Sequence, residues 1–259
     1  MPIIKAICIA LSTYSILPAP RFAWTEDAMR YSLSMLPLVG LLVGACLWAW
    51  HWLCLTLGVG QILFAAVATA IPIIITGGIH MDGFCDTVDA LASHQSRERK
   101  LSIMKDSHAG AFAAIYGALY LLVCFALYTE LFATAALAIA SIGFTLSRAL
   151  VALSALATPN ARGEGLLAKF TDHTARRVSL SIMFLFLLVA AVGMLALRWT
   201  AGGLCLLLCG AWFVGYRALA LHQFGGITGD TTGFFLQTTE LVILFGAVAA
   251  IYLERLAWL

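Results

Sequence analysis

The sequence has very few charged residues for its length. Only 11% of its 259 residues are Asp, Glu, Lys or Arg, whereas 62% are hydrophobic, and the mean hydropathy is +0.97. A soluble domain normally carries about a quarter charged residues, so this chain lacks the charge to cover a water-facing surface. The composition therefore predicts an integral membrane protein. The formal net charge of +2 is too small to indicate a nucleic-acid partner.

The cysteines and histidines lack the spacings of disulfide frameworks and zinc sites. None of the seven cysteines forms a Cys-x-x-Cys pair, and most lie in apolar stretches. Cys205 and Cys209 are four residues apart, but no His or acidic residue lies near them, which indicates helix packing. The sequence therefore argues against a zinc centre and a disulfide scaffold.

Seven apolar stretches are long enough to cross a bilayer, which needs about 20 helical residues. They are residues 33–57, 61–79, 111–129, 131–157, 178–197, 201–221 and 236–256. No small-x-small cleavage site follows residues 2–18, so we expect that segment to stay as an interfacial or re-entrant helix, and a full crossing is left open. The predicted fold is all-α, a polytopic transmembrane helical bundle that forms one integral-membrane domain over residues 1–259.

Basic residues predict how the bundle is oriented. Thirteen of the fifteen lie in the N-terminal segment, in the longer connections 80–110, 158–177 and 222–235, or at the span ends beside them. Only Arg198 and Arg255 fall on the opposite side. Since Lys and Arg are enriched in cytoplasmic loops, the longer connections are expected to face the cytoplasm.

An acidic stripe follows the second predicted span. Asp82, Asp86 and Asp89 have helical i, i+4 and i+7 spacing, so they share one helix face. Three adjacent carboxylates repel one another unless a cation lies among them, and oxygen ligands suit Mg²⁺ or Mn²⁺. Gly83 would let a phosphate or a second backbone approach closely. The alternative is a solvated helix end, but each acid near the bilayer costs about 2.5–3.5 kcal/mol, which favours a metal site.

Two other connections carry polar residues suited to phosphate chemistry. Lys105-Asp106-Ser107 offers a cation and a further acid just before the third span. Four glycines between residues 225 and 233 would free backbone N–H groups to face an anion beside Asp230, although a plain glycine-rich turn would look the same. These loops together predict metal-assisted phosphoryl or nucleotidyl transfer at the cytoplasmic surface.

Arg148 and the connection after its span each have two possible interpretations. Arg148, near the cytoplasmic end of its span, either snorkels to the surface or pairs with a substrate anion. The connection from Arg162 to Lys169 contains two glycines and two cations, so it would serve either as a lid or as an ordinary surface loop.

These motifs resemble those of the cobalamin synthase family, the adenosylcobinamide-GDP ribazoletransferases. The matching segments are residues 77–89, residues 104–107 with Gly110, and residues 225–230 with Gly233 and Glu240. Cys85, Val88 and Phe234 depart from the expected pattern, but no acid is lost. The resemblance implies a Mg²⁺-dependent reaction in the bacterial inner membrane. The hydroxyl of α-ribazole, or of its 5′-phosphate, would attack adenosylcobinamide-GDP, expel GMP and yield adenosylcobalamin or its 5′-phosphate.

The resemblance also implies roles for individual residues. Asp82, Asp86 and Asp89 would hold the metal, and one of them or Asp106 would accept the proton. The substrate-binding residues would be Gly83, Lys105, Ser107, Arg148, Gly226, Thr228, Gly229, Asp230 and Glu240. The expected partners are the two substrates and the lipid bilayer, with a homo-oligomer or contact with other enzymes of cobalamin synthesis left open.

Two other functions remain as alternatives. A CDP-alcohol phosphotransferase would carry a longer motif with Ala-Arg where this chain has Cys85-Asp86. An ion-coupled transporter would place acids near the bilayer midplane, whereas no predicted span has an acid at its centre. Both comparisons favour the transferase.

Overall fold

The computed structural model describes residues 2–20, 22, 25–106 and 108–257, and this part of the chain is almost entirely helical. Within the described residues, six segments are long and apolar enough to cross a membrane, and the bent helix pair Gln61–Ile75 and Ile79–Ala92 makes a seventh if it is counted as one span. The six are η1 with α3 (Leu33–Met35 and Leu36–Leu57), α7 (Ala111–Leu131), α8 (Leu137–Ala157), α10 (Arg176–Leu197), α11 (Trp199–Phe224) and α12 (Gly229–Ala257). The predicted all-α polytopic bundle is confirmed.

The second predicted span, residues 61–79, is shorter than expected. Helix α4 (Gln61–Ile75) ends before Gly77 and Gly78, whose φ values of 62° and 78° lie in the left-handed region that favours glycine. The chain then turns by 92° into α5 (Ile79–Ala92). Hydropathy does not register this turn, because the residues on both sides of it are apolar.

The last predicted loop, residues 222–235, is also shorter than expected. The Thr228 N–H donates to the Thr231 hydroxyl at 2.8 Å, and the Thr231 N–H donates to the Thr228 hydroxyl at 3.1 Å. This reciprocal cap starts α12 at Gly229, so Asp230 lies in the first helical turn. The connection from α11 is therefore only residues 225–228.

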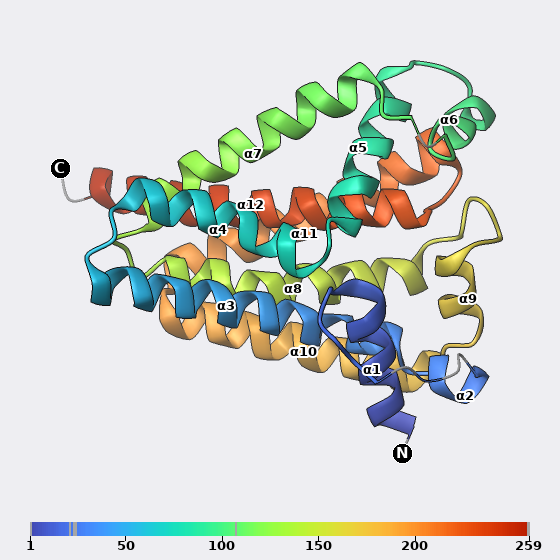
Figure 1. Ribbon diagram of the computed structural model, residues 1–259, viewed down its shortest axis with the longest axis horizontal. Coiled ribbons are helices and arrows are strands. Elements are labelled where there is room, and N and C mark those ends of the chain that lie inside the picture. Colours follow the sequence, from blue (N-terminus) through green and yellow to red (C-terminus); the bar gives the residue numbers. More distant parts are fainter. Residues whose placement is uncertain (1, 21, 23–24, 107, 258–259) are drawn as a thin grey trace.

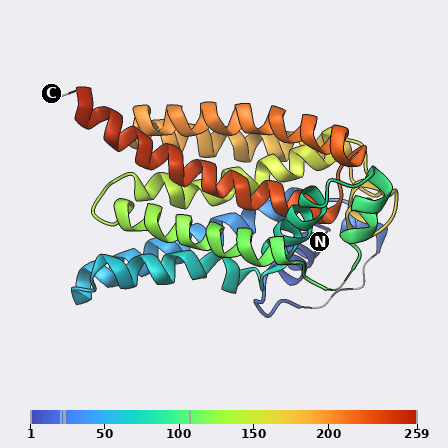
Figure 2. The same cartoon turned by 90° about the horizontal axis from the view of Figure 1, so that it is seen from above.

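The short helices gather toward one end of the bundle, and the tight turns lie at the other (Figure 1). The short helices are α1 (Pro2–Tyr14), α2 (Glu26–Met29), α5, α6 (Arg97–Ile103) and α9 (Leu166–Asp172). Figure 2 shows the same separation from a second direction, with the C-terminus at the opposite end. With 13 residues, α1 is about 20 Å long, too short to cross the bilayer upright. The longer connections thus share one end, as the basic residues predicted.

Two glycines let α3 lie directly against the central helix α8. A Cβ on Gly40 would lie 2.2 Å from the Phe144 carbonyl oxygen, and a Cβ on Gly44 would lie 2.2 Å from that of Ser141. The glycines are one helical turn apart, the spacing that brings membrane helices into backbone contact. Helix α8 is in turn joined to α12 by the buried Arg148–Glu240 ion pair, whose atoms are 2.6 Å apart.

We expect Gly44→Ala to destabilise the bundle. Its methyl group would overlap the Ser141 carbonyl and push α3 away from α8, at a cost of about 1–3 kcal/mol. The matched control is Gly210→Ala in α11, where an added Cβ meets no atom within 4 Å. Thermal unfolding in detergent should show a lower Tm for the first variant only. Equal melting temperatures would contradict the packing described here.

Candidate active site

Helix α5 is held against the start of α12 by two glycines. A Cβ on Gly83 would lie 2.8 Å from the Asp230 carbonyl oxygen, and a Cβ on Gly233 would lie 2.9 Å from the His80 carbonyl oxygen. Any larger residue at either position would separate the two backbones. Of the two explanations for Gly83, close approach of a second backbone is the one the structure shows. The contact brings the Asp82 and Asp230 regions together.

The acidic stripe forms as predicted on one face of α5, and its charges act on one another. Burial, and then the neighbouring charges of Asp82, Asp230 and Asp89, raise the pKa of Asp86 to about 6. Asp86 is half-buried and Asp82 is exposed. Part of this pKa shift comes from repulsion between the carboxylates, and that repulsion is the observation that bears on cation binding. A cation held among these carboxylates would relieve it.

A cavity of about 250 Å³ opens between α5, the start of α12 and the connection after α8. It contains five residues predicted from the sequence: Asp82, Gly83, Thr228, Gly229 and Asp230. The same cavity is bounded by Tyr14 of α1 and by residues 164–167 at the start of α9. Residues far apart in the sequence thus form one pocket at the end of the bundle where the longer connections lie.

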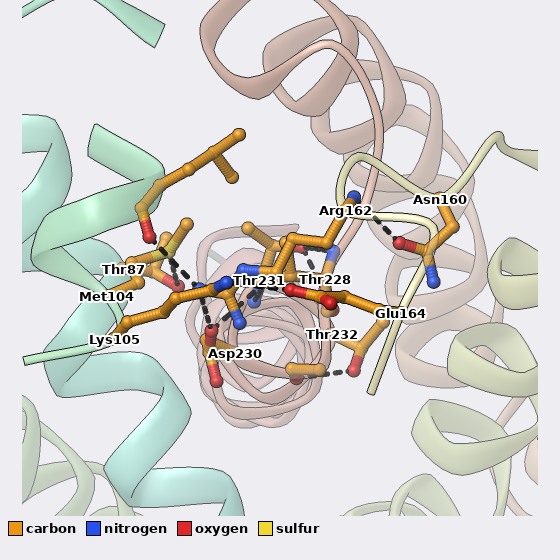
Figure 3. Close-up of polar contacts among 12 residues, drawn as sticks. Thr87, Met104, Lys105, Asn160, Arg162, Glu164, Thr228, Asp230, Thr231 and Thr232 are labelled. Carbon is orange, nitrogen blue, oxygen red and sulfur yellow. Dashed lines mark hydrogen bonds and ion pairs between the residues drawn. The ribbon is translucent and has the colours of Figure 1, made fainter. Parts of the chain in front are cut away.

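Arg162 pairs with Asp230 in the lining of this cavity, and Figure 3 shows the two side chains. Its guanidinium lies 3.0 Å from the Asp230 carboxylate, and its side chain is mostly buried. Asn160 positions it by accepting hydrogen bonds from the Arg162 and Gly163 N–H groups at 2.9 and 3.0 Å. Backbone bonds between residues 159–161 and Ile227 fix this loop beside the glycine-rich turn. Sequence reasoning placed Arg162 in a flexible connection and missed this role.

His80 also lines the cavity and was given no role from the sequence. Its ring stacks on Tyr14, with centroids 6.0 Å apart. Burial, and then the charge of Arg148, lower the pKa of His80 to about 3, so the ring is neutral. Its Nδ1 is buried and has no hydrogen-bond partner in the described part of the chain. The Gly-Ile-His motif next to Asp82 was the available signal.

Asp89 has a structural partner that the helical spacing did not reveal. Its carboxylate accepts hydrogen bonds from the N–H groups of Gly110 and Ala113, at 2.6 and 2.9 Å. Asp89 therefore caps the N-terminus of α7, because it accepts hydrogen bonds from two N–H groups that have no partner within the helix. Across the described residues, no group of three or more His, Cys, Asp or Glu side chains is already drawn together as a metal site. Asp89 as a metal ligand stays a prediction.

The other predicted site residues that the structure describes lie outside the cavity. Asp106 is exposed, and hydrogen bonds from the His108 side chain and backbone lower its pKa. Lys105 pairs with Glu164 at 2.8 Å, which links the loop before α7 to the loop that carries Arg162. Arg148 and Glu240 pair with each other inside the bundle, so Arg148 does not snorkel. Gly226 forms the turn against the Pro159 carbonyl, and Ser107 lies outside the described residues.

The fold and the site define a class of protein: a polytopic helical membrane protein with a carboxylate-lined cavity at one end of its bundle. A family model described as cobalamin-5-phosphate synthase matches residues 6–248. The chain belongs to this family.

Several relatives match over nearly their full length. A protein named adenosylcobinamide-GDP ribazoletransferase from Lachnoclostridium phytofermentans is 40% identical over 250 residues, covering 95% of this chain and 94% of the relative. A protein of the same name from Desulfitobacterium hafniense is 32% identical, covering 97% of this chain and 100% of the relative. Another, from Pseudomonas fluorescens, is 33% identical and covers 92% of this chain and 97% of the relative. No solved structure matches the chain significantly.

We expect Asp89→Asn to destabilise the protein through α7. An amide has one accepting oxygen instead of two, so the Gly110 or Ala113 N–H would lose its partner, at a cost of about 1–3 kcal/mol. The measurement is the Tm of the purified protein in detergent without added metal. Asp172→Asn, at an exposed position in α9, is the control and should melt like the wild type. A normal Tm for Asp89→Asn would contradict the capping role.

Proposed function

We propose that this protein is an adenosylcobinamide-GDP ribazoletransferase that acts at the cytoplasmic face of the bacterial inner membrane. The observation that carries the proposal is the joining of Asp82, Asp230 and Arg162 in one cavity at the end of the bundle. The names of the relatives and their coverage support the substrates. The thirteen basic residues on the side of the cavity support the orientation.

In the proposed reaction, a ribazole hydroxyl attacks the phosphorus that is bonded to the cobinamide. A new P–O bond forms to the ribazole oxygen, the P–O bond to the GMP phosphate breaks, and GMP leaves with the bridging oxygen. The hydroxyl proton passes to a carboxylate. Asp82 suits this step better than Asp106, because Asp82 lines the cavity and Asp106 is exposed beside His108.

Arg162 is the residue best placed to bind the diphosphate. It is the one Lys or Arg side chain among the described residues that line the cavity, and its guanidinium forms a planar fork that fits phosphate oxygens. Its present partner is Asp230. An entering diphosphate would compete for the guanidinium and free the Asp230 carboxylate, while the backbone at Thr228 and Gly229 would line the other side of the phosphates.

The carboxylates of the site fit a divalent cation. Their oxygen atoms are hard ligands, and the repulsion on Asp86 is what a cation would relieve. We propose that Asp82 and Asp86 hold Mg²⁺ and that Asp89 joins them only if it releases the N–H groups of α7. When bound, Mg²⁺ would neutralise charge on the diphosphate.

We expect Asp82→Asn to abolish GMP release while the protein still inserts and folds. The variant removes both the proton acceptor and one proposed ligand. Purified protein would be supplied with adenosylcobinamide-GDP, α-ribazole and Mg²⁺, and GMP would be followed by chromatography, with Asp172→Asn as the control. Near wild-type turnover by Asp82→Asn at saturating Mg²⁺ would rule out the assignment, and no GMP from the wild type with any divalent metal would rule out the function.

We expect Arg162→Gln to raise the KM for adenosylcobinamide-GDP by about tenfold or more, because a charge-assisted bond to phosphate is worth about 1.5–3 kcal/mol. Arg162→Lys should recover part of the loss, since it keeps the charge without the fork. Arg99→Gln is the control, as Arg99 is an exposed α6 residue that lines no described cavity. The same KM in all three variants would show that Arg162 does not contact the substrate.

A further inference from the structure

A second cavity lies on the other side of Asp82. It is a shallow, widely open hollow of about 560 Å³ between the α4–α5 turn, α5 and the start of α7. Met81 and Cys85 line it from α5, and Ala113 and Ala114 line it from α7. Asp82 is the one acidic residue in the described chain that lines both this cavity and the one that contains Arg162. The two cavities therefore share Asp82 in their linings.

The two cavities differ in chemistry. The first has Arg162, Thr228 and Asp230 in its lining, which suits a charged diphosphate. The second has no Lys or Arg among its described lining residues, and Asp82 supplies its only charge. Its other walls are apolar or small side chains and the glycines of the turn. An anion would gain nothing there, whereas a flat, uncharged aromatic group would bury apolar surface against Met81 and Cys85.

The geometry of phosphoryl transfer requires two sites on opposite sides of the phosphorus. In an in-line displacement the attacking oxygen and the leaving oxygen lie roughly opposite each other. Two cavities that share Asp82 suit this arrangement, because the nucleophile would approach from one and the leaving group would depart into the other. A single cavity of about 250 Å³ could not enclose both substrates.

We propose that the second cavity binds the benzimidazole nucleoside part of the ribazole acceptor, while the first holds the diphosphate of the donor. The inference rests on the proposed function and assigns a site to the second substrate. The ribazole hydroxyl then lies next to Asp82, which takes its proton as the oxygen bonds to phosphorus and GMP departs on the Arg162 side. Both the nucleoside and its 5′-phosphate carry the same base, so the site serves either form.

The first test fills the second cavity from α7. Ala114 is exposed to the cavity on a helix that tolerates leucine, so Ala114→Leu should fold normally. We expect the KM for α-ribazole to rise about tenfold or more, with the KM for adenosylcobinamide-GDP changed less than twofold. Ala118→Leu, an exposed position one turn further along α7 that lines neither cavity, is the matched control and should leave both constants unchanged.

The second test measures occupancy without turnover. Ala114→Cys would be labelled with a maleimide, and α-ribazole alone should slow labelling at least fivefold, whereas GMP should not. Ala118→Cys should label at the same rate with or without α-ribazole, and the wild type gives the background from native cysteines. This readout needs neither Mg²⁺ nor the second substrate.

The outcomes separate the inference from the proposed function. An active wild type whose α-ribazole KM is unchanged by Ala114→Leu, with no protection of Ala114→Cys, would overturn the site assignment and keep the function. An equal rise in both KM values would also overturn it, as would protection by detergent or phospholipid but not by α-ribazole, which would make the cavity a lipid groove. A wild type that releases no GMP, together with protection by α-ribazole, would refute the transferase and leave the nucleoside site standing.

Discussion

The backbone contact between α5 and α12 is the constraint on which the site depends. Gly83 and Gly233 bring the two helices so close that a methyl group at either position would overlap a carbonyl oxygen. The contact is reached because Gly77 and Gly78 turn the chain by 92° after α4 and lay α5 near the end of the bundle. Without it, Asp82 and Asp230 would belong to separate helix ends, and the cavity between them would not exist.

The charged residues at this end of the bundle have two roles: some stabilise the fold, and others are available to bind a cation or a substrate. Asp89 caps α7, Lys105 pairs with Glu164, and the buried Arg148–Glu240 pair joins α8 to α12. The Asp89 cap and the buried ion pair hold α7, α8 and α12 in place, whereas the exposed Lys105–Glu164 pair contributes little. By contrast, no hydrogen bond within the described chain holds the side chains of Asp82 and Asp86, and the pKa of Asp86 is raised by burial and then by the neighbouring carboxylates. These carboxylates are left free for a cation or a substrate, which is how a preorganised site differs from an internal ion pair.

Much of the fold could be predicted because its signals are local. Long apolar runs marked the spans, basic residues marked the common end, and helical spacing placed Asp82 and Asp86 on one face. The sequence did not reveal the turn after Ile75, because left-handed glycines end a helix without changing the hydropathy. It also did not reveal the start of α12 at Gly229, because the threonine cap extends the helix into a polar stretch. The roles of Asp89, Arg148 and Arg162 were missed because each is defined by a partner distant in the sequence.

We propose above all that Asp82 and Asp86 of α5 hold a cation beside the contact with α12. Mn²⁺ binding to purified protein, followed by electron paramagnetic resonance without substrates, tests it most directly. We expect one tight class of Mn²⁺ in the wild type, weakened at least tenfold by Asp82→Asn or by Asp86→Asn, with Asp172→Asn unchanged. Tight Mn²⁺ binding that survives the first two substitutions would contradict it.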